Sequence, residues 1–138
     1  MSARKRLALG ILLIVLITLP LAGSRTSVFN RGSSVPQDRS PHLRSLISLG
    51  NDAFNAGRIE QARGIYETGL KHPETEKAHY DRVCLLLGLA NSYVQLHRYS
   101  NALIADFEAE KVASAFGYSD LLSRIAANRA MVYRRMGN

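Results

Sequence analysis

The residues of this chain that could bind a metal ion are widely spaced. The four histidines are His42, His72, His79 and His97, and no two of them lie within five residues of each other. Two imidazoles reach one metal ion from the same helix face only at shorter spacings. The spacing therefore predicts no metal site, and we expect no cofactor.

Candidate nucleophiles and acid–base groups are equally isolated. Cys84 is the only cysteine and lies on an apolar stretch, which indicates a buried small hydrophobe and not an activated thiolate. Glu108 and Glu110 are two residues apart, so they point to different faces of a helix. The glycines form no phosphate-binding loop. These patterns predict that the chain is not an enzyme.

One polar pattern does recur, and it consists of side-chain amides. Asn51 and Asn55 lie four residues apart, and Asn91 and Gln95 form a second pair with the same separation further along the chain. Four residues are about one helical turn, so each pair shares a helix face. An amide both donates and accepts hydrogen bonds, so such pairs can bind a peptide backbone whatever its side chains. The alternative is that these amides only solvate an exposed face.

The offset between the two amide pairs also relates apolar and small residues, and this period of about 40 residues marks a helical repeat. Within the first unit, apolar residues recur at helical spacing on both sides of a break at Gly57, so each unit is predicted to be two amphipathic helices. The sequence therefore predicts an all-α fold. The matched positions include Leu46, Leu86 and Ala126, then Gly50, Ala90 and Ala130, then Ala53, Tyr93 and Tyr133, then Gly57, His97 and Gly137.

These units resemble the tetratricopeptide repeat over about residues 43–138. The resemblance implies a right-handed solenoid of helix-turn-helix units, of which this chain holds two and a half. It also places Ala62 and Ala102 where two helices cross closely. HEAT-like helix pairs, whose period is of similar length, are the alternative fold. Two positions depart from the tetratricopeptide pattern. Asp106 replaces a usual aromatic, whose space we expect Phe107 to take, and Arg129 replaces an apolar residue.

The resemblance further implies a concave groove, lined by the first helix of each unit, that holds an extended peptide or a partner helix. Carrying the family's groove positions over by register gives the residues expected to bind this partner. They are Asn51, Phe54, Asn55, Asn91, Val94, Gln95, Arg124 and Arg134.

The amino terminus has the order of an export signal. Three basic residues, Arg4, Lys5 and Arg6, precede an uncharged apolar run that covers positions 7–23. A membrane-spanning helix needs about 20 residues, so residues 1–24 are predicted to be a signal peptide cleaved near Ser24 or, uncleaved, an N-terminal hydrophobic helix that anchors the chain in a membrane. Residues 25–42 lack apolar periodicity and are predicted to be a flexible linker. We expect an exported, extracytoplasmic location, in a bacterial envelope.

The net charge of +7 is concentrated at the amino-terminal end. Residues 1–44 hold seven basic residues and one acidic residue, whereas residues 45–138 hold eleven basic and ten acidic residues. The excess charge therefore belongs to the predicted export signal and linker, where it orients the segment or contacts anionic lipid. The repeat region lacks the basic stripe that nucleic-acid binding requires, so no nucleic-acid partner is expected.

The chain ends where a sixth helix would begin, because residues 136–138 align with the turn at residues 96–98. An apolar strip on the last helix, at Leu122, Ile125 and Val132, is therefore expected to lack a cover. Such a strip could support self-association through the C-terminal helix.

Together these patterns predict an exported or membrane-anchored scaffold for protein–protein contact. The alternative is the N-terminal sensory or regulatory segment of a larger signalling protein, whose effector domain lies outside this chain.

Overall fold

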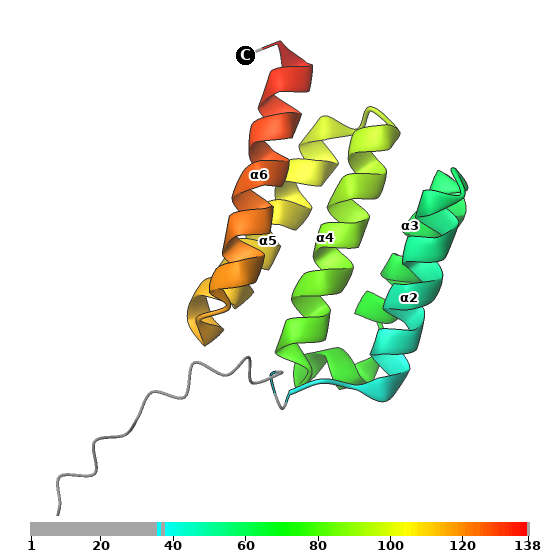
Figure 1. The fold of residues 1–138 in the computed structure, drawn as a ribbon, viewed down its shortest axis with the longest axis vertical. Helices are drawn as coiled ribbons and strands as arrows, with labels where there is room; N and C mark the ends of the chain where they lie inside the picture. Colours follow the sequence, from blue (N-terminus) through cyan, green and yellow to red (C-terminus); the bar gives the residue numbers. More distant parts are fainter. Residues whose placement is uncertain (1–35, 37, 138) are drawn as a thin grey trace, which may run out of the picture. The chain divides into compact units, whose positions relative to one another are not determined.

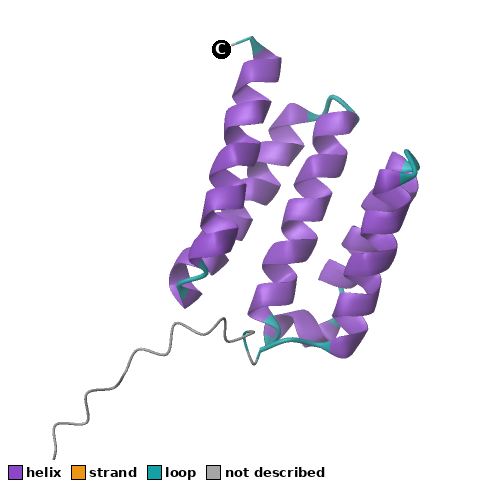
Figure 2. Cartoon of the chain, in the orientation of Figure 1, coloured by secondary structure: helices purple, strands orange, loops and turns teal. Residues whose placement is uncertain are grey.

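The computed structural model describes residue 36 and residues 38–137. Five α-helices and one short 3-10 helix follow one another along this part of the chain. They are α2 (Pro41–Asn55), α3 (Ile59–Leu70), η1 (Pro73–Glu76), α4 (His79–Gln95), α5 (Tyr99–Phe116) and α6 (Ser119–Met136). The described residues contain no strand, which confirms the predicted all-α class for them (Figure 2).

The turns that follow α2, α4 and α6 confirm the register of the repeats. Gly57, His97 and Gly137 all adopt the left-handed conformation, with φ of 76°, 58° and 86°. In the first two turns the next residue donates its backbone N–H to the carbonyl five positions earlier, at 2.9 and 2.8 Å. Glycine adopts positive φ without a steric penalty, whereas another L-residue loses about 1–2 kcal/mol. The equivalent turns therefore mark helical repeats in the structure as well as in the sequence.

The helices form two layers within the domain. Helices α2, α4 and α6 lie side by side and are called here the front layer, and α3 and α5 lie behind them as the rear layer (Figure 1). Helix α4 contacts each of the other four α-helices. Ala62 and Ala102 are fully buried, as expected for residues at close helix crossings. Their small side chains let the layers approach each other.

One departure from the repeat pattern is resolved differently from our expectation. Asp106 is fully buried between α5 and α6, and Phe107 beside it is 51% exposed, so Phe107 does not fill the space of the missing aromatic. The Nδ2 group of Asn128 instead donates to both carboxylate oxygens of Asp106, at 2.9 and 2.8 Å. Arg129 packs over the ring of Phe107 and pairs with Glu110 at 2.6 Å. A polar pair therefore replaces an apolar contact.

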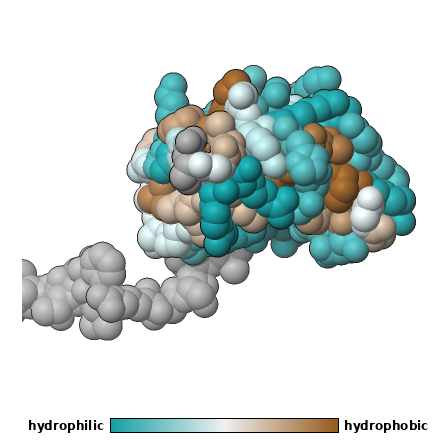
Figure 3. Space-filling model, turned by 90° about the horizontal axis from the view of Figure 1, so that it is seen from above, coloured by the Kyte–Doolittle hydropathy of each residue, from teal (hydrophilic) through white to brown (hydrophobic). Residues whose placement is uncertain are grey.

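The expected uncovered strip on α6 is not exposed as we described it. Ile125 and Val132 are fully buried against α4 and α5, and Leu122 is half-buried. The large apolar residues that α6 does expose are Tyr133 and Met136. From above, where the turns after α2 and α4 lie, the surface is mainly hydrophilic with separate apolar patches (Figure 3). The strip therefore gives no basis for self-association through those two residues.

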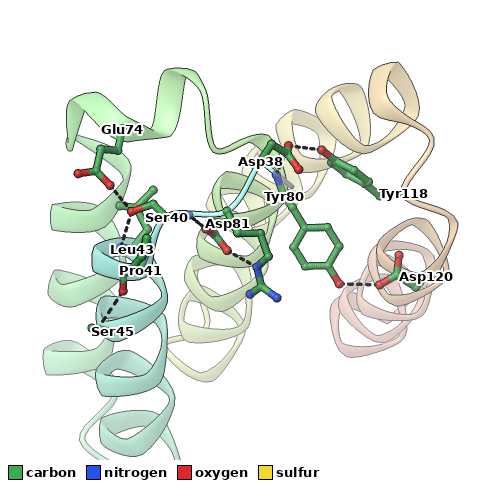
Figure 4. A network of polar contacts seen from close by, with 11 residues as sticks. Asp38, Ser40, Pro41, Leu43, Ser45, Glu74, Tyr80, Asp81, Tyr118 and Asp120 are labelled. Carbon is green, nitrogen blue, oxygen red and sulfur yellow. Dashed lines mark hydrogen bonds and ion pairs between the residues drawn. The ribbon is translucent and has the colours of Figure 1, made fainter. Parts of the chain in front are cut away.

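Residues 38–40, called here the clasp, precede α2 and form polar contacts with residues at the start of α4 and just before α6 (Figure 4). Asp38 accepts hydrogen bonds from the hydroxyl of Tyr118 and from the backbone N–H of Tyr80, the latter at 3.3 Å. Arg39 pairs with the buried carboxylate of Asp81 at 3.0 Å. Ser40 donates its backbone N–H to the same carboxylate at 2.6 Å. The clasp therefore contacts the start of α4 and the residue before α6.

The domain accordingly begins earlier than residue 43, which is the position where we expected it to start. Pro41 occupies the first turn of α2, and Ser40 caps the helix by accepting the backbone N–H of Leu43 at 3.1 Å. The last residues of the expected linker, 38–42, thus belong to the folded unit. The expected signal or anchor at 1–24, and most of the expected linker, lie outside the described residues.

Candidate functional site

A groove of about 340 Å³ opens among the helices of the front layer. Its walls come from α2, α4 and α6, and one side chain of α3 reaches it from behind. The lining residues are Ile47, Asn51, Phe54, Asn55, Tyr66, Cys84, Gly88, Asn91 and Arg124. This lining combines apolar side chains with three amides and one guanidinium group.

Two glycines make room for Tyr66 at the base of the groove. A Cβ atom on Gly50 of α2 would lie 2.4 Å from the Tyr66 ring, and one on Gly88 of α4 would lie 2.5 Å from it. Because real Cβ atoms do not approach so closely, only glycine fits at these positions without moving the ring. Tyr66 is buried, and its hydroxyl donates to Oδ1 of Asn51 at 2.7 Å. An α3 side chain therefore holds an amide of α2 in place.

This bond fixes what Asn51 can offer a ligand. Its Oδ1 accepts from Tyr66, which leaves the two N–H groups of Nδ2 as donors. Asn55 is exposed and Asn91 half-buried, and neither side chain has a hydrogen-bond partner among the described residues. Ile47 and Phe54 are half-buried and provide apolar contact between the amides. The site can therefore bind a backbone and grip an apolar side chain.

Cys84, which the sequence predicted to be a buried small hydrophobe, lies in the groove wall. Burial raises the pKa of its thiol to about 11, although the guanidinium groups of Arg124 and Arg39 act in the opposite direction. At neutral pH the thiol is therefore protonated and a poor nucleophile.

The structure brings together five of the eight predicted binding residues. Asn51, Phe54, Asn55, Asn91 and Arg124 all line the groove.

The other three predicted residues lie elsewhere. Val94 is fully buried and packs against Ala102 and Val132, so its assignment to the groove is corrected. Gln95 and Arg134 are exposed but do not line the groove. Helix α4 is the central helix, and its contacts with both α5 and α6 bury a face that would be open on an end helix.

Sequence reasoning missed Tyr66 and Gly88 as parts of the site. The repeat register matches Gly50 with Ala90 and not with Gly88, so a comparison of the units does not pair the two glycines. The signal that could have found them is the coincidence of two glycines on neighbouring front-layer helices with one tyrosine on α3. A pair of small residues opposite a large one is typical of interlocking helix packing.

The described residues contain no group of three or more histidine, cysteine, aspartate or glutamate side chains that could hold a metal ion. None of the helices in residues 36 and 38–137 is long and apolar enough to cross a membrane. No protein-family model, curated protein or solved structure matches this chain.

Proposed function

We propose that this chain is an exported or membrane-anchored scaffold whose helical repeats bind a segment of a partner protein. The repeats would form a right-handed, tetratricopeptide-like solenoid, and the front-layer groove would hold the partner. The observation that carries the proposal is the convergence of Asn51, Asn55 and Asn91 on one groove, which Ile47 and Phe54 also line. A bacterial envelope is the setting that we propose.

The chemistry of the groove suits an extended peptide. Amide side chains can bond to backbone N–H and C=O groups, which every peptide segment offers. Between Ile47 and Asn55, α2 rises about 12 Å, which is the length of about four residues of extended chain. Phe54 and Ile47 can contact an apolar side chain of such a segment. The high pKa of Cys84 fits non-covalent binding better than covalent chemistry.

Selection from a library of random dodecapeptides tests the groove directly. The full chain, purified in a mild detergent, should enrich a subset of peptides. Binding of an enriched peptide should slow the reaction of Cys84 with a maleimide, because this cysteine lines the groove and is the only one in the chain. No enrichment, or binding that leaves the thiol equally reactive, would overturn the proposal.

A double variant assigns the binding to the amides. Asn51→Ala with Asn91→Ala should weaken the binding of an enriched peptide about fivefold to 150-fold, because each lost hydrogen bond is worth about 0.5–1.5 kcal/mol. The matched control is Asn101→Ala, an exposed amide on α5 that does not line the groove. Equal affinity for the double variant and the control would argue against the amides.

Export is tested separately, by expression with the native amino terminus in a bacterial host. A cleaved signal should give a soluble extracytoplasmic chain that begins near Arg25, and an anchor should leave the intact mass in the membrane fraction. Full-length chain in the cytosol would rule out both forms of the export proposal.

A further inference from the structure

Charge is distributed unequally between the two layers of helices. The front-layer helices carry six arginine residues and three acidic residues, whereas the rear-layer helices carry two basic and five acidic residues. Most of the positive charge is on α6, which has four arginines and one aspartate. The net charge of +1 on residues 45–138 therefore conceals a positive front layer and a negative rear layer.

Three of the four α6 arginines, Arg124, Arg134 and Arg135, are exposed, and Arg124 and Arg135 share one face of the helix. Arg124 lines the groove, and Arg135 is exposed about three turns further along α6, beyond the residues that line the groove. Neither has a salt bridge with any carboxylate of the described residues, whereas Arg129 on α6 pairs with Glu110. No carboxylate lines the groove within the described part of the chain. A negative group entering there would meet positive charge without a competing partner.

The two arginines share one face of α6. They are separated by about three helical turns, and at about 100° per residue this spacing places them within about 20° of each other around the helix axis. Half-buried Met131 lies between them on this stripe. The axial separation is about 16 Å. An extended peptide covers this length in about five residues.

We propose that the groove selects an extended peptide segment whose acidic side chains, about five residues apart, pair with Arg124 and Arg135. This inference rests on the proposed peptide-binding function and adds the chemistry of the partner. Asn51 and Asn91 hold the backbone, and Ile47 and Phe54 contact a side chain between the acidic residues. The guanidinium group is suited to this pairing because it donates two parallel hydrogen bonds to one carboxylate.

The test is the composition of the dodecapeptides that the full chain enriches, with the peptides displayed through their carboxyl ends so that no terminal carboxylate is free. We expect aspartate or glutamate in excess over the input library, most often at two positions four to six residues apart. Affinity should fall as the salt concentration rises, because exposed charges are screened.

Matched variants assign this selectivity to the two arginines. Arg124→Gln with Arg135→Gln should weaken an acidic peptide about tenfold or more and remove the acidic excess from a repeated selection. Lys71→Gln with Lys111→Gln removes the same charge from exposed positions outside the groove, and it should change neither result. Circular dichroism should show unchanged helix content in both double variants.

The outcomes separate this inference from the proposed function. Enriched peptides without an acidic excess, or an excess that survives loss of both arginines, would overturn the inference and leave peptide binding standing. No enrichment of any peptide would overturn both. A random-sequence oligonucleotide or a phosphatidylglycerol vesicle that binds more tightly than the acidic peptides, with the same dependence on Arg124 and Arg135, would assign the positive stripe to another partner and overturn the inference.

Discussion

The carboxyl group of Asp106 occupies an unusual position between α5 and α6. Burial raises its pKa to about 6, while the hydrogen bonds from Asn128 and the charge of Arg129 oppose the increase. Oδ1 of Asn128 is buried and has no partner among the described residues. A protonated Asp106 carries a donor that the carboxylate lacks, and the buried Oδ1 of Asn128 is an acceptor without a partner.

This arrangement makes the stability of the domain depend on pH. An ordinary aspartate ionises near pH 3.9, so between about pH 4 and 6 the unfolded chain loses this proton before the folded chain does. The contribution of Asp106 to the free energy of unfolding therefore falls as the pH rises from 4 to 6, and it stays low above that.

We expect Asp106→Asn to remove this loss. The variant keeps the shape of the side chain and can donate to the buried oxygen of Asn128, so it should be more stable than the wild type by about 1–3 kcal/mol at pH 7.5. The difference should vanish near pH 4. Urea unfolding of both proteins at pH 4 and pH 7.5 measures this difference in the free energy of unfolding. An equal difference at the two pH values would contradict the raised pKa of Asp106.

At the scale of the helices, backbone conformation separates two glycines that have the same open surroundings. A Cβ atom on either Gly57 or Gly64 would meet nothing within 4 Å. Gly57 has a φ of 76° in the turn after α2, whereas Gly64 lies inside α3. Only the local conformation should therefore decide the effect of adding a methyl group.

We expect opposite results from the same substitution at these two glycines. Gly57→Ala should lower the free energy of unfolding by about 1 kcal/mol, because alanine is strained at positive φ. Gly64→Ala should raise it by about 0.5–1 kcal/mol, because alanine favours the helix. Chemical denaturation followed by circular dichroism measures both. A gain or no change in the stability of Gly57→Ala would contradict the turn geometry, and a loss in Gly64→Ala would contradict the helix argument.

The helices and their turns could be predicted from the sequence because helix formation depends on local spacing. Gly57 and Gly117 mark helix ends through their own backbone freedom, which a sequence displays directly. The sequence did not show in the same way which of Asp106 and Phe107 has its side chain buried. It depends on Asn128, 22 residues away, which offers the buried carboxylate a donor. Val94 was misplaced for a similar reason, since its surroundings come from two other helices.

At the scale of the whole domain, the clasp ties together segments that are distant in sequence. Asp38 is bonded to Tyr80 and Tyr118, which are 42 and 80 positions further along the chain. These contacts could not be predicted, because residues 38–40 have no apolar periodicity and their partners lie far away. In a repeat array, stability comes mainly from neighbouring units. The clasp adds a contact that joins the first unit to the start of the last helix.

We expect Arg39→Ala to destabilise the domain, because it leaves the fully buried carboxylate of Asp81 with only the backbone N–H of Ser40 as partner. Breaking a fully buried ion pair costs about 3–5 kcal/mol. Arg39 is partly exposed, so about 1–3 kcal/mol is expected here. The control is Arg44→Ala, an exposed residue of α2 with no salt bridge among the described residues. Equal unfolding midpoints for the two variants would show that the Arg39–Asp81 pair adds no stability.

The position of the clasp also determines how the domain would carry a mechanical load. A pulling force applied at residue 36 reaches Asp38 and Arg39 before it reaches α2. Their partners lie at the start of α4 and just before α6, so the force is divided over several bonds to these two places. Helix α2 is therefore shielded from being peeled away one turn at a time. Tension on the amino-terminal side is therefore taken up by α4 and α6 before it reaches α2, whose side chains form one wall of the groove.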